Sequence, residues 1–177
     1  MKERVKEPAI HREGAAGPTL GGGFEEFFRV EHVRLQQALY VITGSDQEAK
    51  DLMQEAFLRV WERWDRVRAM DEPTGYLYRT AMNAFRSRLR RTARAARNLA
   101  ELRFPSTGFD AIDDRDAVAR ALRSLSERQR AAIVLTELLD FDSAEAAAML
   151  GVRPSTVRNL AAQARKALER ILEVGDE

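Results

Sequence analysis

Apolar side chains recur every three or four residues through most of this chain, and that spacing is the strongest constraint on its fold. Residues 45–64, SDQEAKDLMQEAFLRVWERW, keep the spacing for about five helical turns and begin with a Ser45/Glu48 capping-box pattern. Similar patterns fill residues 24–43 and residues 76–97. Runs of β-branched residues, which would indicate strands, are absent from the sequence. The sequence therefore predicts an all-α fold.

The residue composition excludes several classes of function. The 177-residue chain has no cysteine, so it has no disulfide, no thiolate nucleophile and no Cys-ligated metal. Its two histidines, His11 and His32, are too few for a histidine-based metal site. No glycine-rich loop follows a predicted strand, as a phosphate-binding loop would. We therefore expect no enzyme activity, no cofactor and no metal.

Hydropathy and charge patterning favour a soluble protein with separate charged surfaces. No apolar run approaches the roughly 20 residues of a membrane span, and the N-terminus lacks a signal-peptide core. We expect no membrane insertion and a cytoplasmic location. The formal net charge of +1 hides a sorting of charge into blocks. Residues 73–100 hold seven arginines and no acid, whereas residues 110–116 hold four aspartates and one arginine.

Two regions of helical pattern are separated by a segment rich in turn-forming residues. Residues 1–23 mix Lys, Glu, Gly and Pro and end in GGG, which predicts a disordered tail. Residues 24–97 form a first helical domain and residues 114–174 a second. The segment between them, NLAELRFPSTGFDAID at 98–113, predicts a flexible linker. The expected architecture is two small helical domains joined by that linker.

The second domain shows a series of predicted helices. RDAVARALRSL is the first, and SERQRAAIVLTELL is a second that begins at a Ser126/Gln129 capping box. DSAEAAAML follows as a short helix capped by Asp142. The last helix is expected to run from Pro154 to about Leu172.

A helix-turn-helix pattern lies at the end of this domain. The two helices of such a unit cross closely, which requires a small residue, a turn glycine and an aliphatic residue. Ala147, Gly151 and Val157 supply these at spacings of four and six. The last helix then presents an outward face rich in groups that bind base edges and phosphates. The residues of this face are Arg153, Ser155, Thr156, Arg158, Asn159, Ala162, Gln163, Arg165 and Lys166. An ordinary amphipathic helix with a solvated basic face is the alternative, and the Ala–Gly–Val spacing favours DNA binding.

A second basic surface is predicted in the third helix of the first domain. Positions three or four apart on one helix face carry Asn83, Arg86, Arg90, Arg94 and Arg97. Such a stripe attracts phosphate, although a solvated or RNA-binding stripe is the alternative. Tyr76 and Tyr78 precede it, and these rings either stack on unpaired bases or belong to the core. We expect Tyr76 to be the more buried of the two.

The helix at 45–64 has an acidic outer face instead. Its members are Asp46, Glu48, Asp51, Gln54, Glu55 and Glu62. An acidic face repels phosphate, so this helix either faces water or meets a protein. The residue chemistry by itself favours solvation.

Three segments together resemble the sigma-70 family of RNA polymerase factors. EAKDLMQEAFLRVWERWD is similar to region 2.2 of that family, and YLYRTAMNAFRSRLRR is similar to regions 2.3 and 2.4. ALRSLSERQRAAIVLTELLDFDSAEAAAMLGVRPSTVRNLAAQARKAL resembles region 4. The resemblance covers about residues 24–172, and the short linker leaves no room for regions 1.1 or 3. That layout is similar to the extracytoplasmic-function (ECF) group.

The resemblance implies a sigma factor, which binds the RNA polymerase core and directs it to particular promoters. Region 2.2 of the family docks on the clamp helices of the beta-prime subunit, which makes the acidic face a polymerase contact. The implied polymerase-binding residues are Asp51, Gln54, Glu55, Arg59 and Glu62. The beta flap and an anti-sigma factor are the other protein partners that the family implies.

The resemblance also implies two surfaces that read promoter DNA. Regions 2.3 and 2.4 read the minus-ten element and hold a flipped base of the non-template strand. The matching residues here are Arg66, Arg68, Tyr78, Arg79, Asn83, Arg86 and Arg90. Region 4 reads the minus-thirty-five element as duplex through its recognition helix. The matching residues there are Arg153, Ser155, Thr156, Arg158, Asn159, Ala162, Arg165 and Lys166.

The sequence departs from the family pattern at several positions. Tyr76 stands where the family usually has Trp, and Arg153 stands where the cap of the recognition helix is often Ser. Leu160 and Ala162 replace a usual Arg and His, and AEAAAML makes the preceding helix smaller. These departures keep the fold but prevent the transfer of any known promoter sequence.

Two other functions fit part of the sequence. A stand-alone helix-turn-helix regulator would bind duplex DNA without polymerase, and it leaves the pattern at 45–64 unexplained. A helical interaction protein that has lost promoter recognition would agree with the smaller helix of the second domain.

Overall fold

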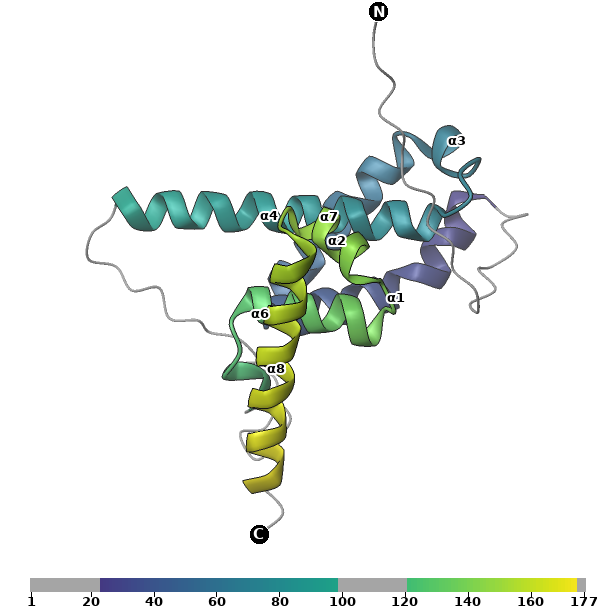
Figure 1. The fold of residues 1–177 in the computed structure, drawn as a ribbon. Coiled ribbons are helices and arrows are strands. Elements are labelled where there is room, and N and C mark those ends of the chain that lie inside the picture. The colour runs from purple at the N-terminus through teal and green to yellow at the C-terminus, as the bar shows by residue number, and fades with distance from the viewer. Residues whose placement is uncertain (1–22, 99–120, 175–177) are drawn as a thin grey trace, which may run out of the picture.

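Helices account for all regular secondary structure in the computed structural model, which describes residues 23–98 and 121–174 (Figure 1). The predicted all-α class is confirmed. The elements are α1 (Phe24–Thr43), α2 (Asp46–Trp61), α3 (Trp64–Val67), α4 (Pro73–Asn98), α6 (Glu127–Ile133), η1 (Val134–Leu138), α7 (Ser143–Leu150) and α8 (Pro154–Val174). Nearly all of the predicted tail, nearly all of the predicted linker and most of the first predicted helix of the second domain lie outside the described residues.

Helices α1 and α2 pack against each other and are joined by a tight turn at Gly44. Gly44 has a φ of 77°, and its N–H donates to a carbonyl in the last turn of α1 at 2.7 Å. Glycine reaches this left-handed conformation without steric cost, which ends α1 where it does. Ser45 caps α2 by accepting from the Glu48 N–H. Only this half of the predicted capping box is formed, because the Ser45 N–H donates to Thr43 Oγ1 and the Glu48 carboxylate pairs with Arg88.

Helix α2 ends at Trp61, earlier than the sequence pattern predicts. Trp64 begins the short helix α3 instead of continuing α2. Its ring packs on Phe24 and Phe27 of α1, with ring centroids 5.5 and 5.2 Å apart. Aromatic pairs at such separations stabilise a core beyond their burial of area. The break after Trp61 therefore places Trp64 over the first turn of α1.

Helix α4 is the longest element and packs its apolar face on α2 (Figure 1). Leu77, Ala81 and Phe85 recur every four residues on one face of this helix and are fully buried. The first turn of α4 is attached to α1, because Thr74 Oγ1 donates to Glu31 Oε1 at 3.0 Å. Glu31 is buried, and sequence reasoning missed this acid inside the core.

The second half of the structure begins with α6. The predicted capping box between Ser126 and Gln129 is formed. The sequence predicts one regular helix through residue 139, but after Ile133 the chain widens into the π-helix η1, whose hydrogen bonding spans five residues. Phe141 follows this wider turn and is buried. The helix α7 then begins with its own capping box, as predicted.

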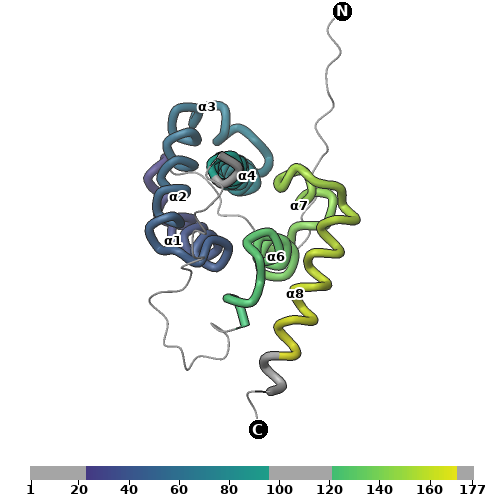
Figure 2. Tube along the Cα trace, turned by 90° about the vertical axis from the view of Figure 1, so that its left-hand side faces the viewer, coloured from purple at the N-terminus to yellow at the C-terminus, as the bar shows by residue number. Residues whose placement is uncertain are grey.

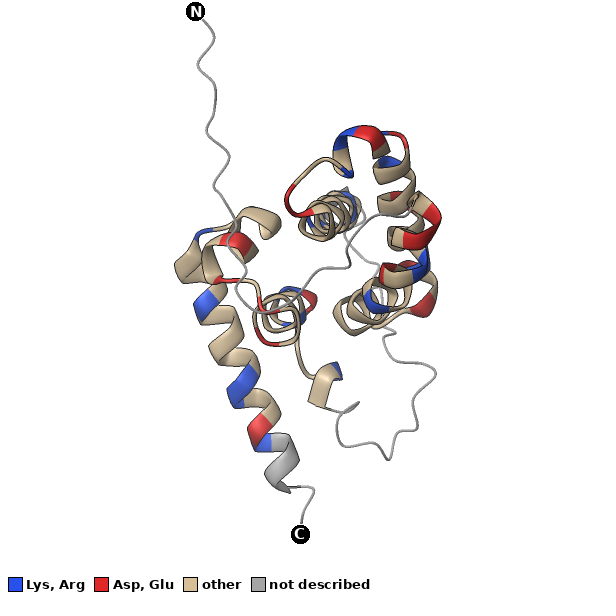
Figure 3. Ribbon diagram, turned by 90° about the vertical axis from the view of Figure 1, so that its right-hand side faces the viewer, with Lys and Arg blue, Asp and Glu red and all other residues tan. Residues whose placement is uncertain are grey.

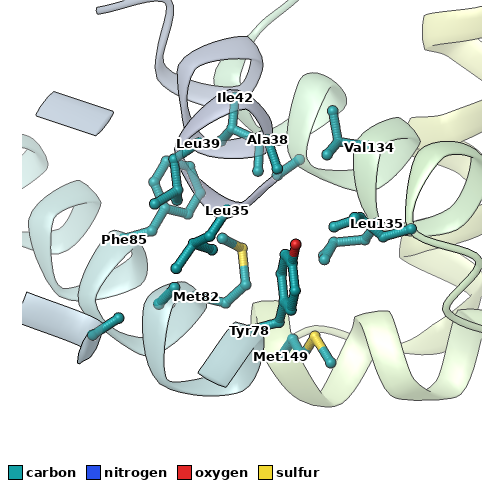
Figure 4. Packing of buried hydrophobic residues seen from close by; sticks show 14 of the residues in the cluster. Leu35, Ala38, Leu39, Ile42, Tyr78, Met82, Phe85, Val134, Leu135 and Met149 are labelled. Carbon is teal, nitrogen blue, oxygen red and sulfur yellow. The ribbon is translucent and has the colours of Figure 1, made fainter. Parts of the chain in front are cut away.

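The two halves share one hydrophobic core. Figure 2 shows α6, α7 and α8 lying beside the group formed by α1 to α4, and contacts join α1 to α6 and α4 to α7. The close view in Figure 4 shows side chains of α1 and α4 facing Val134 and Leu135 of η1 and Met149 of α7. The sequence pattern predicts which helix faces are apolar, but it did not predict that the two domains would cover each other.

Replacing Leu35 by alanine is expected to lower the free energy of unfolding by about 2–5 kcal/mol, because truncation of a fully buried leucine leaves a cavity. Leu58→Ala is the matched control, since the Leu58 side chain is 59% exposed on α2. That change should alter stability by no more than about 0.5 kcal/mol. Urea denaturation followed by circular dichroism measures both variants, and equal losses would contradict the placement of α1 in the core.

Candidate nucleic-acid and polymerase interfaces

The predicted helix-turn-helix is formed by α7, α8 and the turn between them. Helix α7 ends at Gly151, which has a φ of 65° and donates its N–H to Ala147 O. Ala147 and Val157, the small and aliphatic residues of the pattern, are both buried. The smaller α7 is nonetheless firmly in the core, because Ala146 and Met149 are buried as well. The sequence did not single out Met149.

All residues predicted to face outward from the helix-turn-helix are exposed. They are Arg153, Ser155, Thr156, Arg158, Asn159, Ala162, Gln163, Arg165 and Lys166. Some of them also hold α8 in place: Arg158 Nη1 donates to Ser143 Oγ at 3.2 Å, and Gln163 accepts from α6. Arg165 pairs with Glu137 of η1. Figure 3 shows the cations of α8 along the length of this helix.

The arginine stripe of α4 is partly exposed and partly covered. Asn83, Arg90 and Arg94 are exposed, whereas Arg86 is half-buried. Arg86 Nη1 lies 3.3 Å from Asn83 Oδ1 and 3.4 Å from the carbonyl oxygen of Met149 in α7. The side chain of Arg97, the last predicted member, lies outside the described residues. The stripe therefore begins at the contact with the second domain and continues into solvent.

The two tyrosines at the start of α4 are placed opposite to the prediction. Tyr78 is only 1% exposed, whereas Tyr76 is half-buried and its hydroxyl lies 3.4 Å from Arg63 Nη1. Tyr78 shares the i, i+4, i+7 positions with Met82 and Phe85, which places it on the buried face. Its ring packs edge-on against Phe141, with centroids 5.9 Å apart. The expectation that Tyr76 is the more buried ring is therefore wrong.

The other residues predicted to read the minus-ten element lie around the loop between α3 and α4. Arg66 and Arg68 are exposed, and Arg79 is half-buried. Arg68 pairs with Asp65 at 3.0 Å in an exposed ion pair. Exposed pairs contribute only about 0.2–1 kcal/mol, so Arg68 can exchange this partner for a phosphate at little cost.

We call Asp51, Gln54, Glu55 and Arg59 of α2, with Glu62 directly after it, the acid–amide face. All of its members except the half-buried Glu55 are exposed. Glu55 pairs with Arg59 at 2.7 Å across one turn, an arrangement worth only a few tenths of a kcal/mol. Figure 3 shows the charges of α2 and α3 along the outer edge of the molecule, away from α8.

Sequence reasoning missed an apolar patch beside the acid–amide face. Leu58 and Trp61 of α2 are 59% and 60% exposed. Phe28 of α1 is 37% exposed and lies against Phe57 with ring centroids 4.7 Å apart. Large exposed apolar side chains that cluster beside polar ones often mark a protein contact. The sequence does contain a signal for this patch: Leu58 and Trp61 are large apolar residues at positions of α2 that do not face the core.

Within residues 23–98 and 121–174, no group of three or more His, Cys, Asp or Glu side chains could hold a metal ion. Across the same residues, no helix combines the length and apolar character needed to cross a lipid bilayer.

The fold and these surfaces define a class of protein: an all-helical protein with a helix-turn-helix and a separate acidic face. Family models match both halves, sigma-70 region 2 over residues 27–95 and sigma-70 region 4 over residues 115–168. The chain is 31% identical over 150 residues to the ECF RNA polymerase sigma factor SigM of Mycobacterium tuberculosis, which covers 84% of this chain and 76% of SigM. It is 27% identical over 157 residues to the RNA polymerase sigma-E factor of Streptomyces avermitilis, covering 86% and 87% of the two chains.

The chain therefore belongs to the ECF group of sigma-70 family RNA polymerase sigma factors. It directs transcription initiation by RNA polymerase, and members of this family are not enzymes. The alternatives were a stand-alone regulator and an interaction protein that has lost promoter recognition. Because family models match both regions, neither alternative is needed to explain the sequence.

Two solved structures have a similar fold. The sigma factor RpoE of Bartonella quintana, in complex with the anti-sigma factor NepR, superposes with a TM-score of 0.69 at 23% identity, over 85% of this chain and 97% of RpoE. CnrH, in complex with the cytosolic domain of CnrY, superposes with a TM-score of 0.54 at 27% identity, over 85% and 88% of the two chains.

Replacing Asn159 by alanine is expected to weaken promoter binding by the polymerase holoenzyme about tenfold, because one exposed amide that can pair with a base edge is removed. Gln37→Ala, which removes an exposed amide from α1, is the matched control and should have no effect. Fluorescence anisotropy on a labelled promoter duplex measures both. The assignment of α8 to base reading fails if the two variants bind alike.

Proposed function

We propose that this sigma factor uses three separate surfaces on two domains, residues 24–97 and 114–174, with residues 98–113 as the linker. The observation that supports the proposal best is the order of the matches. Region 2 falls on the half that carries the acid–amide face and the arginine stripe, and region 4 falls on the half with the helix-turn-helix.

The first surface is the acid–amide face of α2, which we assign to the clamp helices of the beta-prime subunit. Apart from the half-buried Glu55, its carboxylates and amide are exposed, and their partners are on the same helix, so docking displaces only water and weak intrahelical pairs. Leu58 and Trp61 lie on the same helix and supply apolar area that charged groups cannot. Aromatic side chains surrounded by polar ones are typical of residues that dominate a protein interface. Region 4 is assigned to the beta flap.

The second surface reads the minus-ten element. We assign it to the loop before α4 and to Arg66, Arg68, Tyr78, Arg79, Asn83, Arg86 and Arg90. Arginines along one helix face neutralise the backbone of the displaced strand, and an aromatic ring stacks on an unpaired base. A base that is already flipped out is selected by a pocket rather than by groove contacts.

The third surface is the outward face of the helix-turn-helix, which we assign to the minus-thirty-five duplex. Its residues are Arg153, Ser155, Thr156, Arg158, Asn159, Ala162, Arg165 and Lys166. Each DNA contact is weak by itself. When polymerase holds both domains, the second contact becomes nearly intramolecular and gains effective concentration.

We further propose a cytoplasmic location, where RNA polymerase works, and an anti-sigma protein as an additional partner. The support for such a partner is that the similar CnrH was solved with the cytosolic domain of a second protein, CnrY. An exposed docking face with an apolar patch offers a protein inhibitor the same anchors as polymerase.

The double variant Gln54→Ala with Glu55→Ala is expected to weaken binding to core RNA polymerase at least tenfold, because two polar contacts of the docking face are lost. The matched control is Gln37→Ala with Glu26→Ala, which removes the same side-chain types from α1. Glu26 is also paired within its own helix, to Arg29 at 3.9 Å, so the control removes a comparable ion pair.

Surface plasmon resonance with immobilised core polymerase measures the affinity of both variants. The acid–amide face is contradicted as the docking site if the two double variants bind polymerase equally well. Far-ultraviolet circular dichroism of the free variants confirms that the helices are intact.

A further inference from the structure

Glu31 of α1 is an acid inside the core, with only 4% of its surface exposed. One of its carboxylate oxygens, Oε1, accepts a hydrogen bond from Thr74 Oγ1 at 3.0 Å. Among residues 23–98 and 121–174, no group donates to the other oxygen, Oε2, which is buried as well. The two residues are 43 positions apart in the sequence. The bond is therefore a tertiary contact that joins α1 to the beginning of α4.

The stability of the fold does not explain an acid at this position. Burial of a carboxylate removes its hydration, and a single hydrogen bond from a hydroxyl group replaces only part of that loss. Replacement of buried charged groups by apolar side chains of similar volume is often neutral or stabilising. An apolar side chain at position 31 would serve packing equally well. What the acid adds is a directional bond that fixes the position of Thr74.

Thr74 is the second residue of α4, directly after Pro73. The first turn of α4 contains no acid of its own. A carboxylate beside the first turn of a helix interacts favourably with the positive end of the helix dipole. Here the carboxylate comes from α1 instead of from α4 itself. The bond therefore fixes the point at which α4 begins relative to α1.

The loop between α3 and α4 leads directly into this bond (Figure 1). At the start of the loop, Val67 is fully buried and Met70 packs against the core. Arg66 and Arg68 alternate with these apolar residues and are exposed. The apolar side chains hold the beginning of the loop on the first domain while the arginines face solvent. The hydrogen bond from Thr74 holds the other end of the loop.

A second polar contact lies across the same loop. Arg63, directly before α3, places its Nη1 3.4 Å from the hydroxyl of Tyr76 in α4. Arg63 is exposed, and the distance is long for a hydrogen bond. The bond to Glu31 is shorter and its acceptor is buried, so it is the stronger of the two constraints on the loop.

The position of this loop matters for the reading of an unpaired base. A pocket selects a flipped base only if its polar groups keep fixed positions, and a displacement of about 1 Å can lower a rate about a hundredfold. Apolar packing is not directional and fixes such positions less sharply than a buried hydrogen bond. A buried acid that is not needed for packing is therefore well suited to set the geometry of the loop.

We propose that Glu31 is a positioning residue for minus-ten recognition: through Thr74 it fixes the start of α4 and the loop before it, and so sets how sharply the displaced base is selected. Glu31 does not contact DNA, because it is buried in the first domain. The proposal rests on the assignment of this loop, with Arg66 and Arg68, to the minus-ten element under the proposed function.

Glu31→Met removes the acceptor and is expected to slow promoter opening by the polymerase holoenzyme about tenfold. The temperature of thermal unfolding should not fall, because an apolar side chain replaces a buried carboxylate. Glu31→Gln keeps an oxygen that accepts from Thr74 and should open within about twofold of the unaltered rate. Thr74→Val removes the donor and should slow opening as Glu31→Met does, so the test stays valid if Glu31→Met fails to fold.

Thr136→Val is the matched control for the loss of a threonine hydroxyl. Thr136 is half-buried, and its Oγ1 donates to Ala132 O within the same half of the structure, at 2.9 Å. This variant should open the promoter at the unaltered rate. None of the substitutions changes the acid–amide face, so surface plasmon resonance should give affinities for core polymerase that agree within about twofold.

The probe is a duplex around a start site found by run-off transcription with the unaltered chain. A 2-aminopurine in its minus-ten element reports unpairing by an increase in fluorescence. The ratio of opening rates on this duplex and on duplexes with substituted minus-ten bases measures base selection. Glu31→Met should lower that ratio about fivefold. A general loss of stability would instead slow opening on all duplexes alike and leave the ratio unchanged.

The positioning role is overturned if Glu31→Met opens and selects as the unaltered chain does. It is also overturned if Glu31→Gln loses as much as Glu31→Met, because the charge and not the bond to Thr74 would then be responsible. The double variant Arg66→Ala with Arg68→Ala tests the underlying assignment separately. Opening that falls in this variant but not in Glu31→Met contradicts the positioning role alone. Opening that is unaffected by the double variant contradicts the assignment of the loop.

Discussion

The division of α4 into one buried face and one charged face is the constraint on which the rest of the structure depends. Leu77, Ala81 and Phe85 anchor the helix in the first domain, and Tyr78 and Met82 extend the buried face toward the second. The opposite face carries arginines with no acid on the same helix. Because a helix is rigid, its rotation about its own axis fixes the direction of the buried and the charged side chains together. A rotation of α4 would expose apolar side chains and bury charges at the same time.

Separation of charge supports the proposed assignment of each surface to a partner. The acid–amide face of α2 repels phosphate, whereas the arginines of α4 and the cations of α8 attract it. No single surface could serve both polymerase and DNA in this way. The near-neutral total charge of the chain is therefore compatible with strong local attraction. Arg88 of α4 also pairs with Glu127 of α6 and so helps to hold the two halves together.

Much of the local structure could be predicted from the sequence because it depends on neighbouring residues. The capping boxes at Ser126 and Asp142 and the glycine turn at 151 are of this kind. The contact between the domains depends on residues far apart in sequence and was not predicted. Its signal was a charged residue at an inward-facing position, because Arg130 lies one turn before Val134 and bonds to the end of α1. Periodicity shows that a face is buried but does not show which helix covers it, so the burial of Tyr78 beneath Phe141 required the structure.

We propose that the two domains act only when polymerase carries them to DNA. Run-off transcription with purified bacterial core polymerase on a library of promoter fragments is the decisive test. Transcripts with defined start sites should appear only when both this chain and core polymerase are present. If no defined transcripts appear although the chain binds duplex DNA tightly by itself, the claim is contradicted.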